Sequence, residues 1–407
     1  HDKEIKAAIH QLGQIPDALP VRYQKMVNSL ITLPTSEGGL GLTHAEDMRK
    51  AAYAGSWLLS ARGIENILQT IFIGPEEELP DSVKHIDDLL KELNTQLELS
   101  LPTWETINGS QIGKQQNHIY SEMVKKRKQN FEHFFETEGD STLRSLYFSS
   151  RAPESGAWLL RVPAYKSFYM QNHEFIAALQ TRLMVTPNLA HPLLFLEYNN
   201  ASPTQRKCPL CKNHCINMTI HAMKCDKIRS KTQYGRHNTV RNALAEILRR
   251  DGTNRRIKIE TRLAHLLKNP ALATTTEETP ASQSHPHSAT RTFRADITEH
   301  DSSDHINTII DVTVKTPVAV EGQAAQEGET MKMQHYTNKF HLDGIRVIPF
   351  AVEGAGRFGT TAKEFLKELA LQVSPTQDVH TSEYSKAIAS SYASISHAIA
   401  VKTASTI

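Results

Sequence analysis

The sequence predicts a multidomain protein with a mostly α-helical N-terminal half, a small zinc knuckle and an α/β domain near the C-terminus. Three observations predict this fold class: apolar residues recur at helical spacing in the first 150 residues, all four cysteines lie between Cys208 and Cys225, and the segments after them alternate in the order α-β-β-β-α-β-α. The length of 407 residues allows two or three hydrophobic cores. We place the domains at 1–150, 151–235, 236–375 and 376–407.

The charge distribution favours a polyanionic partner. The formal net charge is only +2, but residues 201–262 contain 15 Lys and Arg against 4 Asp and Glu. A solvated basic surface would explain this excess, whereas binding to nucleic acid explains it more specifically. No apolar run approaches the ~20 residues that a membrane helix needs, and no apolar signal segment follows the N-terminus. The chain begins with His1 and not Met, which fits a fragment or a processed piece.

Helix signals organise the N-terminal half. One helix is predicted from an N-cap at Thr43 to a stop at Gly63, and a second begins at an Asp81 cap. Another fits residues 174–185. The basic run 124–129 should lie on a helix, where a solvated face is a commoner interpretation than contact with phosphate.

The cysteines predict a structural zinc site. Their spacing, Cys-x2-Cys-x9-His-x3-Cys, brings two sulfurs from one tight turn to a single ion, and zinc favours four tetrahedral thiolate or imidazole ligands. A closed set of four leaves no position for water, so the ion should fold a short peptide that has little core of its own. His214 and Cys215 are rival ligands in the same segment. The predicted ligands are Cys208, Cys211, His221 and Cys225.

Residues after the knuckle alternate between helix and strand signals. Helices are predicted at 236–252, 326–340 and 360–373, and strands at 256–260, 292–298, 306–315 and 345–353. The Thr-, Ser- and Pro-rich segment 268–290 should be a flexible loop. An Ala- and Ser-rich helix with a weak core signal is predicted from Glu383.

Two aspartates stand in strands where a charge is costly. Asp296 lies in one predicted strand and Asp311 in its hairpin partner, so the two carboxylates should converge. Like charges raise a pKa unless a cation neutralises them, and Mg²⁺ is commonly held by one or two carboxylates. Glu260, at the end of the preceding strand, would add a third oxygen ligand. The alternative interpretation is a strand-edge residue plus a turn cap.

Cleavage of a phosphodiester also needs a positioned cation. A bound metal lowers the pKa of an attacking water, and a lysine can orient that water or stabilise the growing charge. Lys315 follows Asp311 on the same strand face, whereas Lys332 lies on the next predicted helix with Tyr336 one turn later. We favour Lys332.

The ordered motifs resemble one family. The knuckle, "RHN" opening a helix, "RADI", "DVTV" and a Lys-x3-Tyr helix are similar to the C-terminal region of LINE-type (non-LTR) retrotransposon reverse transcriptase proteins with a restriction-like endonuclease. The element order matches the PD-(D/E)XK nuclease core. Residues 33–57 also resemble the segment after the reverse transcriptase palm, and 175–187 the linker before the zinc motif. The resemblance implies a thumb-like post-palm region in 1–150, a linker with the knuckle in 151–235, and the endonuclease in 236–375.

The resemblance assigns roles to residues of this chain. It makes Asp296 and Asp311 the metal-binding carboxylates and matches Lys332 and Tyr336 to the helix-borne lysine and tyrosine. Two residues depart from the family pattern, since Ala295 stands where proline is expected and Thr313 where the general nuclease motif has lysine. The predicted nucleic-acid-binding residues are Arg236, His237, Asn238 and Arg241.

The function implied is a Mg²⁺-dependent DNA endonuclease. It would nick target DNA and leave a 3′-hydroxyl from which reverse transcription of the element RNA starts. The protein would act in the nucleus. The sequence has no Tyr/Phe-x-Asp-Asp motif of a polymerase palm in a strand-turn-strand setting, so the chain would be part of a longer polyprotein. The alternative is a catalytically inactive, zinc-stabilised nucleic-acid-binding remnant.

Overall fold

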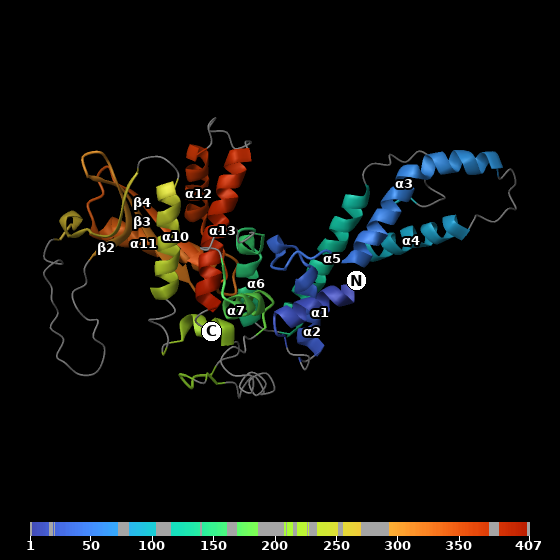
Figure 1. Cartoon of the computed structure of the whole chain (residues 1–407), viewed down its shortest axis with the longest axis horizontal. Coiled ribbons are helices and arrows are strands. Elements are labelled where there is room, and N and C mark those ends of the chain that lie inside the picture. The colour runs from blue at the N-terminus through green and yellow to red at the C-terminus, as the bar shows by residue number, and fades with distance from the viewer. Residues whose placement is uncertain are drawn as a thin grey trace.

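The computed structural model is mostly helical, with one small mixed sheet (Figure 1). Among the described residues, no helix is both long and apolar enough to cross a membrane. Most of the predicted loop 268–290, and Cys215, lie outside the residues that the structure describes. The residues that the structure describes are 2–15, 19, 21–71, 81–102, 115–138, 141–160, 169–185, 207–208, 210–214, 218–225, 227, 234–250, 255–269, 293–373 and 382–404.

The N-terminal half contains two helical cores that share one helix. Helix α5 packs against α3 and α4 through one part of its length and against α2, α6 and α7 through another. In Figure 1, α3 and α4 lie at one end of the molecule and the sheet at the other. The helices are α1 (Asp2–Leu12), α2 (Val21–Thr32), α3 (Ala45–Ile71), α4 (Asp81–Leu97), α5 (Gln115–Glu138), α6 (Ser141–Ser150) and α7 (Asn172–Arg182).

The ends of α3 differ from the prediction. The helix begins at Ala45, and its first N–H groups donate to the carboxylate of Asp2, at 2.8 Å from Ala45 and 3.2 Å from Glu46. Thr43 is therefore not the cap, and the helix continues past Gly63. An anionic side chain from a distant segment satisfies the helix start and opposes its dipole. By contrast, α4 begins at Asp81 as predicted.

The C-terminal part follows the predicted order of elements. A four-stranded sheet has the order β1-β2-β3-β4, in which only β3 and β4 are parallel. Helices α10, α12 and α13 cover one face, and α11 packs against the other. The elements are α10 (Gly235–Arg250), β1 (Arg256–Arg262), β2 (Arg294–His300), β3 (Ile306–Lys315), α11 (Gln323–Lys339), β4 (Arg346–Glu353), α12 (Thr360–Val373) and α13 (Ser382–Ala404).

The last helix is more deeply packed than its sequence suggests. Ile395 and Ile399 of α13 belong to the core beneath the sheet, and Ser396 between them is fully buried. Small side chains allow α13 to approach α10 and α12 closely, while its other side contacts α7 and a short 3₁₀ helix, η3 (Ala157–Leu160). The segment therefore connects the two halves of the molecule instead of forming a peripheral tail.

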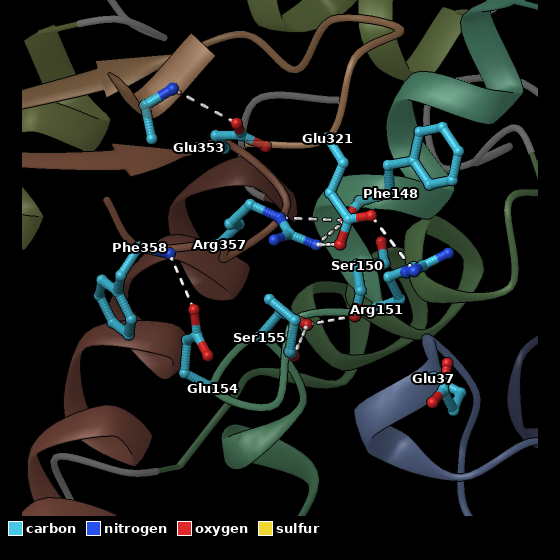
Figure 2. A network of polar contacts seen from close by, with 12 residues as sticks. Glu37, Phe148, Ser150, Arg151, Glu154, Ser155, Glu321, Glu353, Arg357 and Phe358 are labelled. Carbon is cyan, nitrogen blue, oxygen red and sulfur yellow. Dashed lines mark hydrogen bonds and ion pairs between the residues drawn. The ribbon is translucent and has the colours of Figure 1, made fainter. Parts of the chain in front are cut away.

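A polar network joins the helical half to the sheet domain (Figure 2). The guanidinium of Arg357 donates to the Phe148 carbonyl at 2.6 Å and pairs with Glu321, which in turn pairs with Arg151. The carboxylate of Glu154 accepts from the backbone N–H that follows Arg357. Two contacts reach the turn after β4, one from Phe148 and one from Glu154, so the end of α6 and the residues after it hold this turn.

Arg182 at the end of α7 ties three backbone segments together. Its buried guanidinium donates to the carbonyls of Thr35, Gly39 and Ser150. Burial lowers the pKa of Arg182 to about 9, and among the described residues no carboxylate offsets its desolvation. Such a fully hydrogen-bonded arginine fixes the loop after α2 against α7.

Candidate functional site

The cysteine segment forms a compact group of potential metal ligands. The ligand atoms of Cys208, Cys211, His221 and Cys225 all lie within 4.8 Å of one another. Cys211 Sγ is 3.2 Å from His221 Nε2, and Cys208 Sγ is 3.9 Å from Cys225 Sγ. This Cys₃His group can bind a metal ion such as zinc.

Local structure explains why the four ligands meet. The N–H of Lys212 donates to the Cys208 carbonyl at 2.9 Å, and Lys212 has a left-handed φ of 62°, which closes a tight turn between the first two cysteines. His221 and Cys225 lie four residues apart, along and just beyond helix α9 (Met218–Lys224), so they share one side. The rival ligand His214 is exposed and outside the group.

Burial makes the Cys225 thiol depend on a cation. It raises the pKa of Cys225 to about 11, so this thiol stays protonated at neutral pH unless a positive charge lies beside it. A metal ion supplies that charge and displaces the proton.

The two aspartates come together at the end of the β2–β3 pairing. Ile297 of β2 pairs with Ile310 of β3, and Asp296 and Asp311 are the next residues along the two strands. Both side chains are buried, with 9% and 6% of their surface exposed. His237 completes the group, since its ring and the two carboxylates offer ligand atoms within 4.8 Å of one another.

Asp296 is an oriented anion. Its Oδ2 accepts from the Val312 N–H at 2.8 Å and lies 3.0 Å from Nε2 of His237. Burial acts to raise the pKa of Asp296, but hydrogen bonds to His237 and Asp311 hold it below its ordinary value. The carboxylate is thus ionised and fixed in direction.

Asp311 has the opposite electrostatic balance. Burial raises its pKa to about 7, against the attraction of Lys332, and the adjacent Asp296 contributes to the rise. Nζ of Lys332 lies 2.6 Å from Oδ1 of Asp311. Tyr336, one turn further along α11, is 1% exposed, and burial followed by Asp311 raises its pKa well above the usual range.

Lys332 and Lys315 have different surroundings. Lys332 contacts the Asp311 carboxylate from α11, whereas Nζ of Lys315 lies 3.4 Å from Sδ of Met331. The amine beside Asp311 therefore comes from α11 and not from β3.

Glu260 does not join this group. The strand register places it opposite Asp296, but its left-handed backbone, with φ of 57°, is associated with a side chain paired to Arg241 on α10. The expected third oxygen ligand is absent from the described cluster, and the imidazole of His237 takes that place. A positive φ at a non-glycine residue was not readable from the sequence.

The start of α10 also differs from the expected nucleic-acid surface. Arg236 is 2% exposed and donates to the Met223 carbonyl of the knuckle at 2.7 Å, so its side chain is not on the surface. His237 faces Asp296 and Arg241 pairs with Glu260. The helical spacing of four residues between His237 and Arg241 was the signal that both point toward the sheet. Of the four predicted contacts, only Asn238 is exposed.

The basic run on α5 has acidic partners throughout, which favours its interpretation as a structural face. The pairs are Lys125 with Glu122, Lys126 with Glu98, Arg127 with Asp47, and Lys128 with Glu37.

No protein-family model matches the chain, and no curated protein matches it significantly. Function is therefore inferred from the arrangement of the residues described above.

Proposed function

We propose that the protein is a Mg²⁺-dependent DNA endonuclease that nicks target DNA and leaves a 3′-hydroxyl. The observation that carries the proposal is the buried pair Asp296 and Asp311 with the Lys332 amine 2.6 Å from one carboxylate. Two buried acids on a small mixed sheet and a lysine on the helix packed against it are groups that can support hydrolysis of a phosphodiester. They also agree with the resemblance of the motif order to PD-(D/E)XK nucleases.

The carboxylates fit a hard divalent cation. Asp296 and Asp311 would hold it, with His237 beside them, because their ligand atoms already lie within 4.8 Å. A bound Mg²⁺ polarises a phosphoryl oxygen and lowers the pKa of bound water.

The remaining side chains position the reactants. Lys332 orients the attacking water or stabilises charge on the phosphate, and it favours the ionised form of Asp311 in competition with burial. Tyr336 is a positioning residue, because its buried hydroxyl lies against Asp311 and restricts the rotation of that carboxylate.

The knuckle would be structural in this function. With zinc bound, it would stabilise the linker and present its basic flanks to nucleic acid. The further assignments follow from the resemblance: the 3′-hydroxyl would prime reverse transcription of the element RNA, in the nucleus, by a longer polyprotein that contains this chain. The second candidate is an inactive nucleic-acid-binding remnant; the Lys332–Asp311 contact favours the enzyme.

A plasmid-nicking assay tests the proposal. We expect the protein to convert supercoiled plasmid to the nicked form in Mg²⁺, and Asp296→Ala, Asp311→Ala and Lys332→Met each to reduce the rate at least about 100-fold. Lys315→Met is the matched control and should remain within about threefold. Equal nicking by all variants would show that a contaminating nuclease cuts the plasmid, and the endonuclease proposal would be wrong. Plasmid binding without nicking by the unmodified protein would favour the remnant.

A further inference from the structure

Two arginines face each other at the end of the β1–β2 pair. Arg262 and Arg294 are register partners, and both are exposed. Like charges directly opposite on antiparallel strands destabilise a sheet. No described acidic side chain pairs with either one. The situation differs at the other end of the same strands, where Lys258 pairs with Asp304 at 2.7 Å and Arg255 pairs with Glu299.

Two lysines extend this positive surface. The carbonyl of Phe293, the residue before Arg294, accepts from the Leu263 N–H at 2.8 Å, and Nζ of Lys339 lies 5.6 Å from the centre of the Phe293 ring. The N–H of Lys268 donates to the Lys339 carbonyl at 2.9 Å. We name this surface the basic rim: Arg262, Lys268, Arg294 and Lys339.

A rigid base supports the basic rim. Leu263, Leu267 and Phe340 beneath it are buried in one cluster together with Tyr336. The cluster fixes the end of β1 against α11, so the backbone segments that carry the cations keep their spacing. Cations on a fixed backbone lose less entropy on binding an anion than cations on a mobile segment do.

The basic rim adjoins the carboxylate site. Arg294 precedes Asp296 by two residues, which is about 7 Å along a strand. Two carboxylates alone repel a polyanion, so a nuclease site needs cations next to it to hold the substrate. An arginine fork also binds phosphate oxygens in a bidentate manner.

We propose that the basic rim binds the sugar-phosphate backbone of duplex DNA next to the phosphate that is cut. This inference rests on the proposed endonuclease function and identifies where its substrate lies. DNA neutralises the opposed arginines, so the repulsion between Arg262 and Arg294 in the free protein is relieved on binding. Contacts of this kind position the duplex without reading its sequence.

Charge-removing variants of the whole chain test the proposal. The Arg262→Gln/Arg294→Gln pair should raise the Kd for a labelled DNA duplex, measured by anisotropy without added Mg²⁺, about tenfold. It should also reduce the slope of log Kd against log salt by about two. The matched control is Arg249→Gln/Arg256→Gln, which removes the same charge from the last turn of α10 and the start of β1 and should change the Kd less than about twofold. Equal weakening by both pairs would overturn the proposal.

Folding and charge are separated by two further measurements. The Gln pair should keep or raise the melting temperature, because it removes repulsion between neighbours. The Arg262→Lys/Arg294→Lys pair should bind DNA within about threefold of the unmodified protein; a loss equal to that of the Gln pair would overturn the proposal.

The outcomes distinguish this proposal from the proposed function. Normal nicking with an unchanged Kd in the Gln pair would overturn the role of the basic rim and leave the endonuclease. If the unmodified protein does not nick DNA but the Gln pair loses DNA affinity, the endonuclease proposal would be wrong and the basic rim would remain a DNA-binding surface. Rim-dependent binding of RNA that is tighter than binding of DNA would overturn the assignment to DNA.

Discussion

Asp296 and Asp311 have the same side chain but different charge states. Asp296 accepts two hydrogen bonds that favour its ionised form, whereas burial raises the pKa of Asp311 to about 7. The pair can therefore hold one proton near neutral pH, as expected for two acids that share a small buried site. A divalent cation must displace this proton when it binds.

The first prediction follows from that competition. Affinity of the carboxylate site for Mn²⁺, a paramagnetic substitute for Mg²⁺, should fall by up to about tenfold for each pH unit below about 7, because the cation then competes with a proton on Asp311. Electron paramagnetic resonance of free Mn²⁺ measures the affinity. A constant affinity between pH 5.5 and 8 would contradict the prediction.

The raised pKa of Asp311 also affects stability. The folded protein binds this proton more tightly than the unfolded chain does, so the contribution is fully present below the unfolded pKa of about 3.8 and is lost as pH rises through about 7. At pH 8, Asp311→Asn should increase the free energy of unfolding by about 1 kcal/mol, and at pH 5 by much less.

Urea unfolding at both pH values measures this difference. The exposed Asp343 provides the control, since Asp343→Asn should give the same small change at pH 5 and pH 8. If Asp311→Asn destabilised the protein equally at pH 5 and pH 8, ionisation of the buried Asp311 carboxylate would not reduce the stability of the folded protein.

At the scale of elements, backbone N–H groups in the first turns of several helices donate to carboxylates from other segments. Asp2 accepts from the start of α3, Glu353 accepts from the Ala325 N–H in α11, and Glu329 of α11 accepts from the Thr361 N–H in α12. Each contact satisfies an N–H that has no partner within its helix and places a negative charge at the positive end of the dipole. These helix starts thus depend on tertiary structure.

The cap on α12 gives a third prediction. Glu329→Ala should reduce the free energy of unfolding by about 1–2 kcal/mol, because it leaves helix N–H groups of Thr361 and Ala362 without their acceptor. Glu327→Ala, at an exposed position two residues earlier, should change stability by less than about 0.5 kcal/mol. Urea denaturation compares the two, and equal effects would show that Glu329 does not act as a cap.

Long-range contacts also set the limits of sequence-based prediction. The order of strands and helices around the sheet was predictable, because alternation and helical spacing record which face of each element is buried. The start of α3 was not, since its cap lies 43 residues away in Asp2. The burial of Arg236 and the turn of Glu260 toward α10 were likewise invisible, because each depends on a partner from another element.

At the scale of the whole molecule, the knuckle and the carboxylate site are linked through adjacent residues. Arg236 donates to the Met223 carbonyl, between the ligands His221 and Cys225, and the next residue, His237, contacts Asp296. The first turn of α10 is therefore held by the knuckle on one side and by the sheet on the other.

The fourth prediction concerns zinc removal. A zinc chelator should unfold the knuckle and increase amide hydrogen exchange about tenfold in residues 236–240, because these residues lose one of their two supports. Residues 244–248, which pack in the core of the sheet domain, serve as the internal control and should keep their protection. Unchanged exchange in the first turn after complete zinc removal would show that the two sites are independent.

The burial of α13 has a consequence for synthesis of the protein. Ile395 and Ile399 fill the core that α10 also lines, yet about 130 residues separate the two helices in the chain. At about 5–20 residues per second, the ribosome delivers α13 on the order of ten seconds or more after α10. During that interval the apolar side of α10 is without a main partner, so chaperones that recognise nascent chains have time to bind it.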